Sequence, residues 1–237
     1  MEWTYLPSID PTTNYGSLIG QCHDILPTDL YLLLENWCYT NPHYMGHQPE
    51  EMPVPRTQIW YQQDHNYFCP SWKGVFPRWK SRTYDTILQL VQNYIQTRID
   101  SFLASYSSDQ SSHQKVILEH PKINSCLVNR YRNGNDSIKP HRDSRDSFGP
   151  TPTIIGLSLG QCRTLELQPA LKNHQQHPSY RFKIPDNSLF IMAGNSQNQY
   201  LHSIPKQKST SSLLPNFERF SLTFREWKHP DQIQPNN

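Results

Sequence analysis

Residues 124–148, NSCLVNRYRNGNDSIKPHRDSRDSF, carry the pattern around which the rest of the chain can be organised. An apolar, strand-like run is followed by a turn at Asn133-Gly134 and then by a polar run that holds His141 and Asp143. A His and a carboxylate two residues apart on an extended backbone project from the same face. A second His from a facing strand would complete a facial triad, which holds Fe(II) on one side and leaves the other side open. We expect His202, in the strand-like run 200–204, to be this third ligand.

The H-x-D pair is a weak pattern by itself, because the chain has eleven histidines. The alternative interpretation is that His141 and Asp143 are solvated loop residues and that His202 belongs to the core. Neighbouring residues that suit a cosubstrate of the metal would favour the metal site over this alternative.

Two arginines supply such a feature. Arg219 and Arg225 lie six residues apart in the strand-like run ERFSLTFRE, so both side chains leave the same face of a sheet. Two arginines on one face of an otherwise apolar strand are unfavourable unless they are paired with anions. A small dicarboxylate such as 2-oxoglutarate would supply the anions, with one carboxylate on the metal and the other on an arginine fork. The alternative is that the arginines form surface ion pairs with Glu218 and Glu226.

Composition indicates one soluble globular domain. The chain has 237 residues, a formal net charge of +2 and 18% charged residues, which permits a nucleic-acid partner without indicating one. Five cysteines without a C-x-x-C spacing argue against a disulfide framework or a thiolate zinc site and favour reduced thiols. No apolar leader and no run of membrane-spanning length is present. We therefore expect an intracellular, soluble monomer, cytoplasmic or nuclear, with no membrane partner.

Periodicity predicts a mainly β fold with flanking helices (α+β). Apolar residues at helical spacing predict helices over 27–38 and 83–103, and residues 57–68 resemble two short strands. Seven further strands suggest a barrel or a two-sheet sandwich. They are predicted at 125–131, 153–159, 164–167, 181–184, 188–192, 200–204 and 220–226. We expect a loosely ordered arm over 1–20, a single domain over 21–228 and a tail over 229–237.

A series of short motifs in this order resembles the AlkB family of Fe(II)- and 2-oxoglutarate-dependent dioxygenases, of the type that repairs alkylated nucleic acid. The motifs are NRY (129–131), Gly134, HRD (141–143), IIGLSLGQCRTL (154–165), LHSIP (201–205) and RFSLTFR (219–225). The resemblance implies a double-stranded β-helix (jelly-roll) core with an N-terminal nucleotide-recognition lid at roughly 41–80. It also implies oxidative demethylation of N-alkylated bases in DNA, with RNA as a further candidate. That reaction uses Fe(II), 2-oxoglutarate and O2 and releases formaldehyde, succinate and CO2.

The resemblance assigns roles to individual residues. His141, Asp143 and His202 would bind the iron, and Asp143 would be its carboxylate ligand. The 2-oxoglutarate site would consist of Asn129, Tyr131, Arg219, Thr223 and Arg225. The substrate site, where an extruded base stacks against the His141 ring, would include Tyr61, Tyr67, Phe68 and Ser144. Tyr44 or Met45 would be a wedge that fills the space left by the base.

Departures from the family pattern leave the substrate open. Repair members carry an acidic residue directly after H-x-D, whereas this chain has Ser144 and Arg145 there. Either Asp146, which follows, substitutes for that residue after a small change of register, or the substrate differs. One alternative keeps the chemistry but acts on RNA or on a protein or lipid side chain. Another is a non-catalytic nucleic-acid-binding module with a degenerate site. A zinc hydrolase is disfavoured, because no H-E-x-x-H motif is present.

Overall fold

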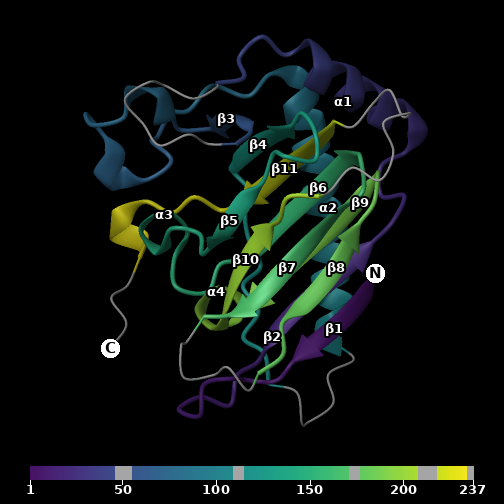
Figure 1. Cartoon of the computed structure of the whole chain (residues 1–237). Coiled ribbons are helices and arrows are strands. Elements are labelled where there is room, and N and C mark those ends of the chain that lie inside the picture. The colour runs from purple at the N-terminus through teal and green to yellow at the C-terminus, as the bar shows by residue number, and fades with distance from the viewer. Residues whose placement is uncertain (46–54, 109–114, 171–176, 208–217, 234–237) are drawn as a thin grey trace.

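The fold consists of two antiparallel sheets that face each other, with two long helices on the outer face of the larger sheet (Figure 1). The structure, a computed structural model, describes residues 1–45, 55–108, 115–170, 177–207 and 218–233. The major sheet contains, in spatial order, β1 (Glu2–Leu6), β2 (Ser17–Cys22), β9 (Ser188–Gly194), β6 (Ile154–Gly160), β11 (Arg219–Arg225), β4 (Ser125–Tyr131) and β3 (Thr57–Gln62). The minor sheet contains β5 (Ile138–His141), β10 (Tyr200–Ile204), β7 (Arg163–Pro169) and β8 (Tyr180–Ile184).

Strand periodicity separates the two faces of the major sheet. Along β11, Phe220, Leu222 and Phe224 are buried in the core under the helices. The alternate residues, including Arg219 and Arg225, line a cavity between the two sheets. Successive side chains of a strand point to opposite faces, so one short sequence builds both the hydrophobic core and a polar interior.

Helices α1 (Thr28–Thr40) and α2 (Thr86–Ser108) cover the outer face of the major sheet. Leu88, Val91, Ile95 and Ile99 recur at three- and four-residue spacing in α2 and are fully buried. The Asp85 side chain accepts a hydrogen bond from the Leu88 backbone N–H, so Asp85 caps this helix. Both helices were expected from the sequence and are confirmed, with bounds shifted by a few residues.

The mainly β prediction with flanking helices is confirmed, and all seven strands predicted after residue 122 are present. The prediction of a loosely ordered arm over 1–20 is wrong, because this segment contains β1 and most of β2. Leu18 and Ile19 are fully buried, and β2 pairs with β9 along its whole length. The second strand predicted within 57–68 is also wrong. After β3 only an isolated bridge joins Tyr67 to Lys80.

Shorter elements complete the described chain. They are η1 (Pro70–Trp72), η2 (Pro77–Trp79), α3 (Arg145–Phe148), α4 (Ser196–Gln199) and η4 (Pro230–Gln232). The element η4 falls within the predicted tail over 229–237. None of the helices in the described ranges combines the length and the apolar character needed to cross a bilayer.

The division of β11 into two faces yields a stability prediction. Leu222 is fully buried under the helices, so Leu222→Ala should lower the free energy of unfolding by about 2–5 kcal/mol. Leu32→Ala on α1 is the matched control, because Leu32 is exposed and its truncation should change stability by less than about 0.5 kcal/mol. Urea unfolding followed by circular dichroism measures both. Equal effects of the two substitutions would contradict the assigned packing.

Candidate active site

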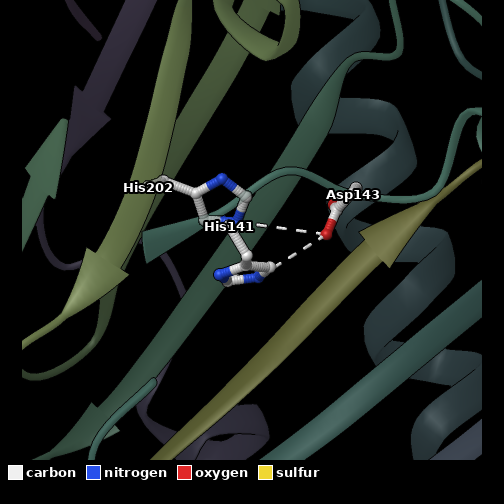
Figure 2. A group of neighbouring side chains, drawn as sticks. All are labelled: His141, Asp143 and His202. Carbon is white, nitrogen blue, oxygen red and sulfur yellow. Dashed lines mark ion pairs between the residues drawn. The ribbon is translucent and has the colours of Figure 1, made fainter. Parts of the chain in front are cut away.

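The structure brings together the three residues predicted to bind metal. His141 ends β5 and His202 lies opposite it in the antiparallel neighbour β10, so their rings lie side by side with centroids 4.1 Å apart. Asp143 follows two residues after His141, and its Oδ1 lies 3.9 Å from His141 Nε2 and 4.0 Å from His202 Nε2. Figure 2 shows the three side chains pointing toward one another. One ligand atom from each lies within 4.8 Å of the others, so a single cation placed between them can contact all three.

Hydrogen bonds orient two of these side chains. The Nδ1–H of His141 donates to the Lys139 carbonyl at 2.9 Å, which leaves Nε2 as the lone-pair nitrogen on the side of Asp143. Arg225 Nε donates to Asp143 Oδ2 at 2.7 Å, while Asp143 Oδ1 faces the two imidazoles. The Asp143 backbone N–H also donates to Gln197 Oε1.

Burial and charge put the three groups in the protonation states that metal ligation needs. Burial, together with the adjacent His141, lowers the pKa of His202 to about 3, and burial also lowers the pKa of His141. Burial alone would raise the pKa of Asp143, but the Arg225 charge and the two imidazoles outweigh it and hold this pKa below its ordinary value. At neutral pH the cluster therefore presents two neutral imidazoles and one carboxylate.

No carboxylate of the described residues pairs with Arg219. Its Nε donates to Ser158 Oγ at 2.9 Å and its guanidinium lies over the Tyr131 ring. Nη1 is buried with no hydrogen-bond partner among the described residues. Glu218, the ion-pair partner in the alternative interpretation, instead pairs with Arg130 at 2.9 Å. A buried guanidinium with a free donor is unfavourable until an anion reaches it.

One cavity of about 380 Å³ joins the metal cluster to Arg219. Asn129, Tyr131 and Thr223, which were expected at the cosubstrate site, also line it. Its volume is in the range of small-ligand sites. The residues present therefore fit Fe(II) held by His141, Asp143 and His202, and a dicarboxylate that extends from the metal toward Arg219.

The expected base-binding aromatics divide into residues inside and outside the cavity. Phe68 lines it and stacks on Trp72 with centroids 5.6 Å apart. The assignment of Tyr61 is wrong. Tyr61 packs against Trp37 and Tyr84 under the helices, because the β3 residue on the inner face is its neighbour Trp60.

The remaining substrate candidates also divide. Tyr67 is bridged to Lys80 and is not among the cavity-lining residues, so its expected stacking role is not supported. Ser144 does line the cavity, with Oγ 3.7 Å from Cys69 Sγ. Asp146 is exposed on α3 away from the cavity wall, so it does not replace the missing acidic contact.

The expected lid, 41–80, contributes residues that were not assigned to the site. Gln58 lines the cavity from β3, and Arg56 from the residue just before that strand. Period-two alternation through Gln58 and Trp60 is a signal in the sequence that could have identified Gln58. Tyr44 is no wedge, because its ring packs beside Phe220 with centroids 6.2 Å apart. Met45 pairs with Gln58 through the backbone, and residues 46–54 lie outside the described ranges.

The free Nη1 donor of Arg219 yields a prediction with two readouts. Arg219→Met removes a buried charge, so without cosubstrate the variant should gain about 1 kcal/mol in free energy of unfolding. With Mn(II) present, 2-oxoglutarate should raise the melting temperature of the unmodified protein but not of the variant. Differential scanning fluorimetry with and without 2-oxoglutarate measures this.

Arg181→Met is the control, because Arg181 is exposed and pairs with Glu166 on the minor sheet. It should keep the stabilisation by 2-oxoglutarate. A similar stabilisation of Arg219→Met would contradict the assignment of Arg219.

Comparisons with known proteins agree with this geometry. Residues 35–225 match the family model described as "2OG-Fe(II) oxygenase superfamily". The chain is 37% identical over 108 residues to human "alpha-ketoglutarate-dependent dioxygenase alkB homolog 3", which is 44% of this chain and 36% of that protein. It is 29% identical over 147 residues to Arabidopsis thaliana "DNA oxidative demethylase ALKBH2", which is 51% of this chain and 45% of that protein. The matches thus span less than half the length of these two relatives.

Solved structures support the fold. OsALKBH1 superposes with a TM-score of 0.62 at 13% identity, over 88% of this chain and 97% of that one. A prolyl hydroxylase from Trichoplax adhaerens, solved with a hypoxia inducible factor peptide, gives a TM-score of 0.52 at 13% identity, over 88% and 83%. At this identity the likeness concerns the fold alone, and it confirms the predicted double-stranded β-helix. The chain therefore belongs to the 2OG-Fe(II) oxygenase superfamily, whose metal, cosubstrate and oxidant are Fe(II), 2-oxoglutarate and O2, and the relatives it resembles within that superfamily are AlkB homologues.

Proposed function

We propose that this protein is an Fe(II)- and 2-oxoglutarate-dependent dioxygenase that removes alkyl groups from N-alkylated bases in DNA. One observation carries the proposal. The His141, Asp143 and His202 cluster and Arg219, whose Nη1 has no hydrogen-bond partner among the described residues, line the same cavity, and part of its wall is aromatic. Metal, cosubstrate and a flat substrate can thus meet in one enclosed space.

The cosubstrate is positioned by groups from β11 and β4. Arg219 receives the distal carboxylate, and Thr223, Asn129 and Tyr131 offer further polar contacts along the same wall. Arg225 has a separate task, because its Nε is bonded to Asp143 and holds that carboxylate toward the imidazoles. Apolar residues of the wall, among them Leu127 and Ile154, keep bulk water from the reacting carbon.

When bound, Fe(II) with 2-oxoglutarate and O2 supplies the oxidation, in which 2-oxoglutarate is converted to succinate and CO2 and the N-alkyl carbon gains a hydroxyl group. The N-hydroxymethyl product of a methylated base then breaks its N–C bond, releasing formaldehyde and restoring the N–H. The protein contributes orientation, since hydroxylation requires the alkyl group to face the metal.

An aromatic wall supports a nucleobase as the substrate. Phe68, Trp72 and Trp79 line the cavity, and a flat base extruded from a strand can stack on such rings. The human relative is named a dioxygenase, and the Arabidopsis relative is named a DNA oxidative demethylase. DNA is therefore the preferred substrate in the proposal.

The test is product release from methylated oligonucleotides. Purified protein is incubated with Fe(II), 2-oxoglutarate, O2 and N-methylated single-stranded DNA, duplex DNA or RNA, and formaldehyde and succinate are quantified. Formaldehyde should appear from methylated DNA in equal amount to succinate. His141→Ala should lower the rate by more than roughly 100-fold, because a lost ligand should cost more than a lost supporting contact.

His120→Ala is the matched control, because His120 is exposed and does not line the cavity. It should keep the unmodified rate. Formaldehyde release from methylated RNA but not from methylated DNA would identify RNA as the substrate instead. Succinate without formaldehyde from any oligonucleotide would contradict the nucleic-acid substrate while leaving the oxygenase chemistry.

A further inference from the structure

We propose that the cavity selects a neutral N-alkylated base with a carbonyl oxygen beside the alkylated nitrogen, the N1-methylguanine type, over cationic bases such as N1-methyladenine. The proposal rests on the proposed function and specifies the substrate class of the same site. It follows from the charges and the unpartnered polar atoms of the cavity wall.

The cavity wall is strongly cationic. Among the described residues, four arginines line it (Arg56, Arg142, Arg219 and Arg225), against one carboxylate, Asp143. Asp143 is bonded to Arg225 and faces the metal position, so it is not free to neutralise a substrate. Arg219 is matched by the cosubstrate carboxylate. The two remaining arginines, Arg56 and Arg142, have no ion pair within the described part of the chain.

Arg56 lines the same cavity as the metal cluster. Its Nε donates to Asn129 Oδ1 at 2.7 Å and its Nη1 to the Ser137 carbonyl at 3.3 Å. Both acceptors are neutral, so neither of them balances the charge of the guanidinium. A base held in this cavity therefore experiences the Arg56 cation. A second cation there is disfavoured by like-charge repulsion in a partly desolvated site.

Gln58 adds a hydrogen-bonding preference. Its side chain is 2% exposed, lines the cavity, and has an Oε1 without a hydrogen-bond partner among the described residues. A buried acceptor of this kind is satisfied by an N–H of the ligand. Arg56, one period-two step earlier on the chain, offers N–H donors to a carbonyl oxygen, as arginine does to guanine O6.

The four common N-methylated bases differ in how well they suit Arg56 and Gln58. N1-methylguanine is neutral, with a carbonyl on one side of the methylated nitrogen and an amino group on the other. N3-methylthymine is neutral but has two carbonyls and no amino group. N3-methylcytosine has both a carbonyl and an amino group but is a cation, and N1-methyladenine is a cation without a carbonyl. The guanine lesion alone in this set satisfies Arg56 and Gln58 without adding a positive charge.

The experiment compares these four lesions. Each is placed at the same position of one single-stranded DNA sequence, and kcat/KM for formaldehyde release is measured with Fe(II) and 2-oxoglutarate. N1-methylguanine should exceed N3-methylcytosine, which is a cation, by roughly tenfold or more. N1-methylguanine should also exceed N3-methylthymine, which lacks the amino group. Binding of the four strands to His141→Ala, measured by fluorescence anisotropy, should follow the same order.

Variants separate the two determinants. Arg56→Gln should shift the guanine-to-cytosine ratio toward cytosine by roughly tenfold, whereas Arg181→Gln, the same substitution at an exposed site, should leave the ratio unchanged. Gln58→Leu should reduce the guanine-to-thymine ratio. Ser144→Asp adds a carboxylate to the cavity wall while Arg56 is retained, and it should also favour the cationic bases. This variant tests the same inference if Arg56→Gln does not fold. Ratios between substrates cancel any general loss of activity.

Faster reaction of N3-methylcytosine or N1-methyladenine than of N1-methylguanine would overturn the neutral-base inference and leave the proposed function standing. An unchanged guanine-to-cytosine ratio in both Arg56→Gln and Ser144→Asp would also overturn it. Failure to release formaldehyde from any of the four lesions would instead contradict the proposed function, and the inference with it.

Discussion

The ion pair between Arg225 and Asp143 is the interaction on which the site depends. Arg225 Nε and Asp143 Oδ2 are 2.7 Å apart, and their side chains are 4% and 3% exposed. Removing one partner of such a buried pair leaves an uncompensated charge and costs about 3–5 kcal/mol. Arg225 comes from the major sheet and Asp143 follows β5 of the minor sheet, so the pair also connects the two sheets beside the metal cluster.

The position of β11 explains why a sheet can carry two buried arginines. It is bonded on one side to β6 and on the other to β4, and its Phe220, Leu222 and Phe224 are buried under the helices. These contacts fix the backbone of β11. The side chains of Arg219 and Arg225 therefore project into the cavity rather than into solvent. Arg225 is paired with Asp143 within the chain, whereas Arg219 keeps a donor for a ligand. A site for a metal and a dicarboxylate requires both kinds of arginine.

Much of this arrangement could be predicted from local patterns. The bounds of the strands at 125–131 and 200–204 follow from apolar runs between turn residues, and the spacing of Arg219 and Arg225 places them on one face. Gly160, the last residue of β6, is another position where the local conformation requires the residue type found in the sequence. Its φ is +82°, and an added Cβ would come within 2.5 Å of the Glu218 carbonyl, beside Arg219.

The errors have equally physical causes. Strand β2 is a short apolar run after a Pro- and Asn-rich stretch, and its partner β9 lies about 170 residues further along the chain, so nothing local marks it. Tyr61 and Trp60 are adjacent large aromatics, and a one-residue choice of register decides which of them faces the cavity. Charge selection by Arg56 and Gln58 could not be foreseen, because it depends on which polar atoms remain unpartnered once the chain has folded.

A crystal structure of the protein with Mn(II) and 2-oxoglutarate would show the metal and cosubstrate sites directly. We expect the metal to contact His141, Asp143 and His202, the distal carboxylate to accept hydrogen bonds from Arg219, and Arg225 to remain bonded to Asp143. Metal bound elsewhere, or a distal carboxylate seated on Arg56 with Arg219 still unpartnered, would contradict this assignment.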